Sequence, residues 1–146
     1  MAGFTNILVA TDFGKPAARA TQLAAALAEA FGAKLTLLFV FSVPPTMGLV
    51  GGPLPIEELR ARARKTLDAE TARLEERLPG VTSLMRTGSP WEEILQEAKE
   101  LGADLIVLGT HGRQGLPRAL IGSVAERVLR MASIPVLTVA AAEGEA

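Results

Sequence analysis

Glycines crowd one late stretch of the chain, GTHGRQGLPRALIGSV, which runs from Gly109 to Val124. The stretch follows an apolar run and leads into a helical pattern, so we expect it to leave a strand and to feed the N-terminus of a helix. Such a loop offers free backbone N–H groups and the positive end of a helix dipole. Glycine also permits positive φ and lacks the β-carbon that would hold a phosphate at a distance. The stretch therefore predicts a polyphosphate-binding loop, although glycines after a strand are also ordinary turn residues.

The side chains within this stretch favour binding over catalysis. Gly109 and Gly112 would let the chain turn sharply away from the strand, and the Gly122-Ser123 pair adds a hydroxyl donor near the start of the helix. No base is identifiable for Ser123, so it is better interpreted as a phosphate donor or helix cap than as a nucleophile. His111 is the only histidine and cysteine is absent, which excludes His-rich and Cys-based metal sites and leaves little basis for a catalytic triad.

Cations near the loop fit the same interpretation. Arg113 and Arg118 could donate charge-assisted hydrogen bonds to phosphate oxygens, and Lys15 could reach the same crevice from an earlier loop. The best-known phosphate motifs fail on spacing. Gly14-Lys15 is followed by Pro16 rather than by the serine or threonine of a Walker loop, and no G-x-G-x-x-G follows the first apolar run.

Length, charge and hydropathy limit the class of protein. The 146 residues fit one domain spanning 1–146, and the formal net charge of −1, with both signs interspersed, argues against a nucleic-acid partner. The N-terminal MAGFTNILVATDF does not resemble a signal peptide, and no apolar run approaches the roughly eighteen residues of a membrane span. We therefore expect a cytoplasmic protein without a membrane partner, and a disordered tail over 141–146.

Two sequence patterns, short apolar runs and helical patterns, alternate along the chain and indicate the fold class. Short apolar runs, expected as strands, cover 6–11, 34–40, 81–87, 104–110 and 135–140, and the more mixed run 81–87 suits an outer strand. Helical patterns separate them, which implies parallel pairing with right-handed crossovers. The prediction is an α/β fold: a three-layer, open, doubly wound, five-stranded parallel sheet. Ligands of such sheets bind where the strand order reverses. If the reversal falls between the first and fourth strands, Asp12 and the glycine-rich loop face one crevice.

Four helices are predicted from apolar spacing. The proposed apolar faces are Ala20, Leu23, Ala24, Leu27 and Phe31 in the first; Ile56, Leu59, Ala63, Leu67, Leu74 and Leu78 in the second; Ile94, Leu95, Ala98 and Leu101 in the third; Val124, Val128, Leu129 and Ala132 in the fourth. In the third helix, Ser89 reads as the N-cap, Pro90 as the first helical residue, Glu92 as the acid of a capping box, and Gly102 as the residue that ends it. The proline- and glycine-rich segment 42–58 is either a stiff surface connection or a mobile flap over the site.

A resemblance to a known family now joins these observations. Gly109-x-x-Gly112, nine further residues and then Gly122-Ser123 reproduce the G-2x-G-9x-G-[ST] motif of ATP-binding universal stress proteins. NILVATDF resembles the first strand of that family, with its characteristic aspartate, and the segment from Gly109 through IPVLTV resembles its C-terminal part. The resemblance covers essentially residues 4–140. It implies the strand order 3-2-1-4-5 of the adenine nucleotide alpha hydrolase-like fold.

The same resemblance implies a nucleotide site for ATP, or for ADP or AMP, with or without Mg²⁺. Its residues are Ala10, Asp12, Val40, Gly109, His111, Gly112, Arg113, Gly122, Ser123 and Val124. Ala10 and Asp12 would lie beside the adenosine, with Asp12 near the ribose or the metal, and the Val40 backbone would face the adenine edge. Asp12 could instead simply cap the first helix. Family members often have serine where this chain has Gly14, so the start of that helix lacks a capping hydroxyl.

The last apolar run suggests a second chain as a partner. IPVLTV would lie at a sheet edge, and an exposed apolar edge invites pairing with another copy about a two-fold axis. Relatives of this family commonly dimerise in that way. We therefore expect a homodimer through residues 135–140.

Several functions compete at this stage. The leading hypothesis is an ATP- or adenine-nucleotide-binding regulatory protein of the stress response, without a catalytic residue. A slow ATP hydrolase of the same fold, working through Asp12 and a metal, is one alternative. A dimeric interaction module that no longer needs nucleotide is another. A phosphoacceptor receiver is rejected, because Thr87 and Ala140 stand where it needs an aspartate and a lysine.

Overall fold

The computed structural model of the chain describes residues 3–42, 55–111 and 121–140. Within these ranges the elements are β1 (Asn6–Thr11), α1 (Lys15–Phe31), β2 (Lys34–Phe41), α2 (Ile56–Arg77), β3 (Thr82–Thr87), α3 (Pro90–Leu101), β4 (Leu105–Gly109), α4 (Ser123–Met131) and β5 (Val136–Val139). The predictions for Gly112, Arg113, Arg118, the tail 141–146 and most of the segment 42–58 lie outside the described residues.

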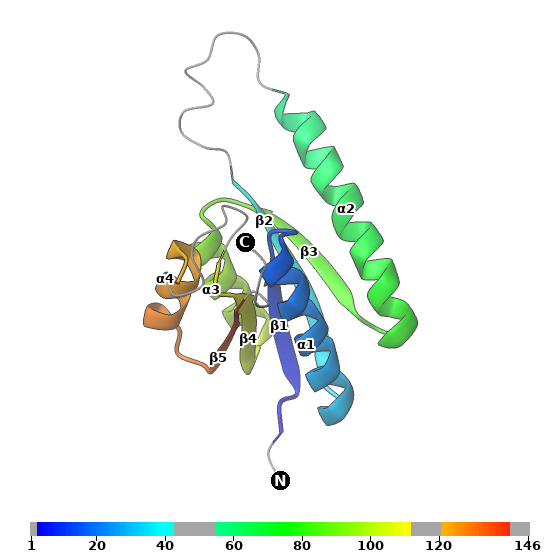
Figure 1. Cartoon of the computed structure of the whole chain (residues 1–146), viewed down its shortest axis with the longest axis vertical. Coiled ribbons are helices and arrows are strands. Elements are labelled where there is room, and N and C mark those ends of the chain that lie inside the picture. Colours follow the sequence, from blue (N-terminus) through cyan, green and yellow to red (C-terminus); the bar gives the residue numbers. More distant parts are fainter. Residues whose placement is uncertain (1–2, 43–54, 112–120, 141–146) are drawn as a thin grey trace.

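The strands form one parallel sheet in the order β3-β2-β1-β4-β5, which confirms the predicted fold class (Figure 1). β1 is central, and it pairs with β2 from Asn6 opposite Lys34 and with β4 from Ile7 opposite Leu105. The direction of winding reverses between β1 and β4, so their carboxyl ends diverge into loops that lead to different faces of the sheet. This is the place where open α/β sheets bind ligands.

Helices cover both faces of the sheet and create two cores. Because side chains alternate along a strand, Ile7 and Val9 of β1 pack against α1 and α2, whereas Leu8 packs against α3 and α4. Figure 1 shows α2 beside β3 at one edge and α4 beside β5 at the other. Both faces of the central strands are therefore dry, as their nearly continuous apolar sequences predicted.

The helix faces were predicted less accurately than the strands. In α1, Leu23 and Phe31 are 38% and 43% exposed, so the predicted apolar face is wrong at these positions. The buried residues of α1 are small ones: Pro16, Ala17, Ala20, Thr21, Ala24, Ala25 and Ala28. A helix that lies this close to a sheet has room for methyl groups rather than for large side chains, and Phe31 instead packs edge-on against Phe4. In α4, Leu129 is likewise 41% exposed, and Ala125 is buried.

The helix ends match the sequence in part. Gly102 adopts a left-handed conformation (φ 66°) and ends α3, as predicted, and Ser89 and Pro90 occupy the predicted positions at its start. The predicted capping box is wrong, because within the described part of α3 no side chain makes a capping hydrogen bond. In α2, Leu67 and Leu74 are buried as predicted.

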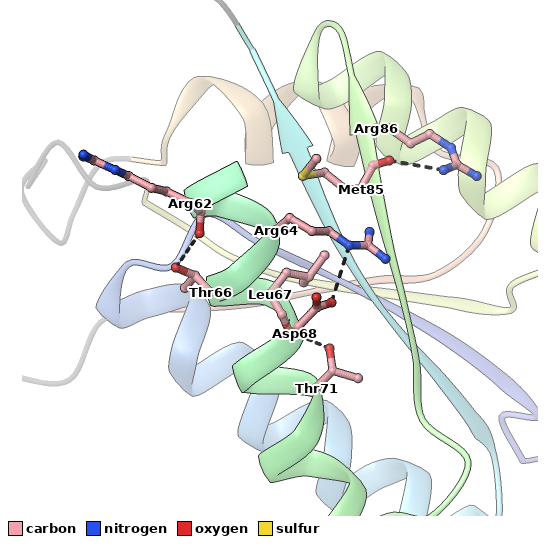
Figure 2. A network of polar contacts seen from close by, with 8 residues as sticks. All are labelled: Arg62, Arg64, Thr66, Leu67, Asp68, Thr71, Met85 and Arg86. Carbon is pink, nitrogen blue, oxygen red and sulfur yellow. Dashed lines mark hydrogen bonds and ion pairs between the residues drawn. The ribbon is translucent and has the colours of Figure 1, made fainter. Parts of the chain in front are cut away.

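The outward side of α2 is polar. Figure 2 shows Arg64 directed toward Asp68, and Thr66 and Thr71 donating hydrogen bonds to backbone carbonyls one turn earlier. The ion pair between Arg64 and Asp68 measures 3.5 Å. Such exposed pairs contribute little to stability. Leu67 and Leu74, the buried side chains of α2, hold it on the sheet. None of the helices in the described ranges is long and apolar enough to cross a membrane.

A carboxylate ties the amino ends of β1 and β4 together. Asp104 accepts hydrogen bonds from the Thr5 amide (2.8 Å), the Thr5 hydroxyl (3.0 Å) and the Asn6 amide (3.0 Å). Its own amide donates to the Asn6 carbonyl oxygen at 2.9 Å. Desolvation acts to raise the pKa of Asp104, but the hydrogen bonds from Thr5, Asn6 and its own backbone outweigh it and hold the pKa below its ordinary value. This end of the sheet is closed by satisfied polar groups.

Candidate functional site

A cavity of about 470 Å³ lies at the carboxyl ends of β1, β2 and β4, where the sheet order reverses. Eight of the predicted site residues line it: Ala10, Asp12, Val40, Gly109, His111, Gly122, Ser123 and Val124. These residues come from three strand ends and from the start of α4, although the chain separates them by more than a hundred positions. The remaining two, Gly112 and Arg113, lie outside the described residues, and Lys15 does not line the cavity.

Two bends of the glycine-rich stretch meet at this cavity. The Gly122 amide donates to the Thr110 carbonyl oxygen at 2.5 Å, and the Thr110 amide donates to the Val139 carbonyl oxygen at 2.9 Å. The loop that leaves β4 and the start of α4 are therefore joined directly. This contact brings Gly122 next to the residue that follows Gly109 in the chain.

The first turn of α4 presents donors to the cavity that find no partner within 3–42, 55–111 and 121–140. The first hydrogen bond of the helix runs from the Glu126 amide to the Gly122 carbonyl oxygen at 3.0 Å. The amides of Ser123, Val124 and Ala125 precede it, so the helix itself offers them no acceptor. All three residues line the cavity, and no side chain among the described residues caps this turn. An anion placed there would meet several N–H groups and the positive end of the helix dipole.

Asp12 occupies a turn rather than a helix cap. Its Oδ1 accepts the Gly14 amide at 2.9 Å, and Gly14 is the N-cap residue of α1, which has no side-chain cap. The Thr11 hydroxyl accepts the Phe13 amide at 3.0 Å, and Phe13 adopts the left-handed region (φ 66°). These bonds fix the carboxylate at the cavity wall. The alternative in which Asp12 caps the first turn of α1 is not what the structure shows.

The Phe13 ring stacks on Phe39 at a centroid distance of 4.6 Å and an interplanar angle of 19°. Phe39 itself contributes to the cavity lining. A left-handed conformation is unfavourable for a bulky residue and persists only where surrounding contacts enforce it. The stack and the two turn hydrogen bonds are those contacts, so the turn that carries Asp12 is held in a strained shape.

Gly109 is required for a different reason than the sequence suggested. Its φ is not in the left-handed region, so the position does not need glycine for a sharp turn. A β-carbon at Gly109 would lie 2.9 Å from Pro16 Cβ and 3.0 Å from the Pro16 carbonyl carbon. The glycine therefore allows the end of β4 to touch the first turn of α1. This close packing forms one wall of the cavity.

His111 is a buried residue of the lining. It is 5% exposed, and its Nδ1 lies 3.0 Å from the Thr110 hydroxyl. Its Nε2 is sealed from water and has no hydrogen-bond partner within the described parts of the chain. A buried polar atom without a partner is unusual in a native protein and calls for an explanation.

The chemistry of the lining suits a nucleotide more than a bare metal ion. Asp12 is the one carboxylate among the described lining residues, and no cluster of three metal-ligating side chains occurs in the described ranges. Mg²⁺ is commonly held by one or two carboxylates together with substrate phosphates. Asp12 fits that role only alongside a bound phosphate chain, where the metal would supply charge neutralisation.

Several lining residues were not predicted: Phe41, Ser42, Pro90, Ile94, Thr110 and Ala125. Pro90 and Ile94 were recognised as the start of a helix, and that helix follows directly on β3. The sequence could therefore have identified them as lining residues, because a helix that directly follows a parallel strand begins at the carboxyl edge of the sheet. Thr110 carries no such signal, since its role depends on contacts with residues distant in the chain.

A larger cavity, of about 590 Å³, lies at the opposite end of the sheet, between the amino ends of β1, β2 and β3. Its lining includes Asn6, whose side chain donates to the Leu101 carbonyl oxygen, and Thr36, whose hydroxyl is hydrogen-bonded to that of Thr82. These polar groups are already paired with protein. The smaller cavity, with its unused donors, is therefore the better candidate for a ligand site.

Comparison with known proteins agrees with the fold. Residues 3–140 match the model of the universal stress protein family. A universal stress protein of Methanocaldococcus jannaschii is 35% identical over 139 residues, which cover 93% of this chain and 82% of that protein. The structure of universal stress protein UspA from Lactobacillus plantarum superposes with a TM-score of 0.80 at 28% identity, covering 95% of this chain and 99% of that one. A universal stress protein from Archaeoglobus fulgidus, solved in complex with dAMP, has a TM-score of 0.68 at 26% identity and covers 94% and 99%.

Proposed function

The chain belongs to the universal stress protein family, and from that premise we propose that it binds an adenine nucleotide in the carboxyl-end cavity and acts as a homodimeric regulatory protein of the stress response. One observation carries the nucleotide proposal: the bend after β4 and the amide-rich start of α4 line the same cavity and are joined through Gly122 and Thr110. The A. fulgidus relative in complex with dAMP supports an adenine nucleotide as the ligand.

The proposed pose follows from the groups at each wall. The phosphates lie on the amides of Ser123, Val124 and Ala125, which are the unused donors. The ribose lies near Ala10 and Asp12, whose carboxylate can accept hydrogen bonds from a diol. The base lies toward the end of β2, where the Val40 backbone faces its edge. A volume of about 470 Å³ is within the range of small-ligand pockets.

Gly112 and Arg113 belong to the proposed site through the family motif alone. ATP, ADP and AMP all fit the proposal, with Mg²⁺ bound through the phosphates and Asp12.

The second candidate function, slow ATP hydrolysis, is favoured only by the presence of Asp12 in the same lining as the amides of α4. Asp12 would then orient the metal and its water. Turnover that survives in Asp12→Asn would contradict that role.

The proposed homodimer forms through residues 135–140. β5 is an edge strand with half-buried side chains throughout, and the nearby Met131 is 57% exposed. Antiparallel pairing of two β5 strands about a two-fold axis would satisfy the open edge of each. Sedimentation at micromolar concentration is expected to give a dimer, and a monomer would contradict the proposal.

The decisive experiment identifies the ligand without assuming it. Mass spectrometry of small molecules released from the purified protein is expected to find an adenine nucleotide. Calorimetric titration with AMP, ADP and ATP, each with and without Mg²⁺, then ranks them. Trp91 is the only tryptophan and the second residue of α3, next to the cavity residue Pro90. The Arg127 guanidinium lies 5.0 Å from the centre of the Trp91 ring. The fluorescence of Trp91 offers an independent report of binding. No heat and no fluorescence change with any nucleotide would favour the interaction module that no longer needs nucleotide.

A further inference from the structure

Thr110 stands at a junction that no sequence motif singled out. Its amide donates to the Val139 carbonyl oxygen of β5 at 2.9 Å, and its carbonyl oxygen accepts the Gly122 amide at 2.5 Å. Its hydroxyl lies 3.0 Å from His111 Nδ1. Thr110 therefore joins the end of β4 to the edge strand, to the start of α4 and to an imidazole of the cavity lining.

The contact between hydroxyl and imidazole fixes one peptide group. Thr110 and His111 flank a single peptide plane, and this plane carries the carbonyl to which Gly122 donates. A hydrogen bond between adjacent side chains closes a small ring, which restricts rotation of the plane between them. The position of Gly122, and with it the direction of the free amides of α4, consequently depends on the Thr110 side chain.

The other ring nitrogen of His111, Nε2, has no partner among the described residues. If Nδ1 carries the proton and donates to Thr110, the lone pair of Nε2 has no donor; in the other tautomer, the Nε2 proton has no acceptor. Within the described residues the imidazole thus keeps one bond, to Thr110, and leaves a buried atom unpaired. A buried polar atom left unpaired calls for an explanation, and the bond to Thr110 is the contact that the ring retains.

We infer that Thr110 is a positioning residue of the cavity, and that ligand binding at α4 stiffens the edge strand β5 through it. The inference rests on the proposed function, because it takes a nucleotide phosphate as the ligand. A phosphate on the first amides of α4 restrains Gly122, and Gly122 restrains the Thr110 carbonyl. Because the Thr110 amide is the donor to Val139, the last rung between β4 and β5 then opens less often. By linkage, whatever stiffens that rung also tightens the ligand.

The test compares Thr110→Val, which keeps the branched shape and removes the hydroxyl, with Thr110→Ser, which keeps the hydroxyl. The matched control is Thr36→Val, which removes a buried hydroxyl bonded to Thr82 (3.0 Å) at the other end of the sheet. AMP affinity is measured by titration calorimetry. Amide hydrogen exchange is followed with and without AMP in residues 136–140 and, as an internal reference, in the opposite edge strand at 82–87.

In the wild type, AMP is expected to slow exchange more in 136–140 than in 82–87, because ligand binding that acts only on global unfolding protects both edges alike. Thr110→Val should weaken AMP binding roughly 3- to 10-fold, as expected for one lost hydrogen bond, and should abolish the extra protection of 136–140. Thr110→Ser and Thr36→Val should retain both. Unchanged affinity and extra protection in Thr110→Val would overturn the inference while leaving the proposed function intact, as would equal protection of both edges in the wild type. Failure of AMP to bind the wild type would overturn both.

Discussion

The two ends of the sheet differ in whether their polar groups are hydrogen-bonded within the protein. At the amino end, Asp104 gathers the donors of Thr5 and Asn6, and the Asn6 side chain finds the Leu101 carbonyl. At the carboxyl end, the first amides of α4 and one nitrogen of His111 have no partner in the described chain. Both ends are built from the same kind of loop between strand and helix. The difference indicates that the hydrogen bonds of the amino end stabilise the fold, whereas the carboxyl end has donors left over that a ligand can use.

The carboxyl end also holds a strained residue and a close backbone contact within the described chain. Phe13 is the non-glycine residue at positive φ, and Gly109 touches the first turn of α1. Neither feature follows from the needs of a stable sheet. Both shape the wall that carries Asp12. Substitutions at the two ends should therefore separate stability from binding.

The largest expected effect is that of Gly109→Ala. The new methyl would lie 2.9 Å from Pro16 Cβ and 3.0 Å from a backbone carbon, so β4 and α1 must move apart. We expect a loss of about 2 to 3 kcal/mol in the free energy of unfolding, typical of an overpacked core, and at least tenfold weaker AMP binding. Urea unfolding and calorimetry measure the two effects.

The control for this substitution is Gly102→Ala at the amino end of the sheet. Gly102 has φ 66° but open space around a β-carbon, so the change should cost about 1 kcal/mol through backbone strain alone. AMP affinity should be unaffected. If both variants weaken AMP binding equally, the proposed division between the two ends is wrong.

Asp104→Ala is expected to have the next largest effect, on stability alone. Removing the carboxylate takes the acceptor from the amides of Thr5 and Asn6, and because water can reach the exposed Thr5 in its place, the cost should be about 1 kcal/mol. Asp68→Ala removes an exposed carboxylate that only meets Arg64, and should change stability by less than about 0.5 kcal/mol. Thermal unfolding of both variants, with AMP titration as the second measurement, checks this. Weakened nucleotide binding in Asp104→Ala would count against the comparison.

A comparable effect, on binding alone, is expected from Ser123→Pro. Proline is favoured at the first helical position, and the preceding Gly122 already has φ −66° and ψ 158°, which proline tolerates. The helix should therefore form normally, but one amide donor for the phosphate is lost. We expect AMP binding about 5- to 10-fold weaker at unchanged unfolding temperature.

Ser123→Ala serves as the partner variant, since it removes only an exposed hydroxyl and keeps the amide. Its affinity for AMP should lie between those of the wild type and Ser123→Pro. Equal affinities of all three proteins would show that the phosphates do not use the start of α4.

The smallest expected effect is a pH dependence at the amino end. The folded-state pKa of Asp104 lies below its ordinary value, because hydrogen bonds from Thr5, Asn6 and its own backbone outweigh desolvation. Its stabilising contribution is therefore present above the unfolded value of about 3.9 and is lost as the pH falls through the folded pKa. The stability difference between the wild type and Asp104→Asn should thus shrink below about pH 4. A difference that stays constant down to pH 2 would contradict this.

The sequence predicted the sheet well, because a buried parallel strand is a run of branched apolar residues whose position hardly depends on context. The order of strands and the crevice between β1 and β4 followed from the family resemblance and from the connection rules. The face of α1 was predicted in part: Ala20 and Ala24 are buried. Leu23 and Phe31 have the right spacing, but the helix lies too close to the sheet to bury them. Spacing alone cannot report how far a helix stands from a sheet.

In the candidate site, too, residues that belong to a sequence motif were predicted, whereas roles that depend on contacts between distant segments were not. Asp12, Val40 and Gly122 were found from motifs, and the structure places them around one cavity. The reason for Gly109 was missed, because it depends on Pro16, and Thr110 was missed because its partners lie on β5 and α4. Such roles arise from contacts between segments, which a pattern along the chain does not contain.

The two helices on one face of the sheet are attached unequally. α1 rests on the sheet through seven buried side chains, whereas α2 buries Leu67 and Leu74 along 22 residues. Because α2 buries fewer of its residues than α1 does, its amides should exchange with solvent sooner than those of β1 and α1. On this face of the sheet, α1 is therefore held by a continuous row of small buried side chains, whereas α2 is held by two buried leucines and by contacts of Arg60 with Thr87 and of Arg77 with Gln22.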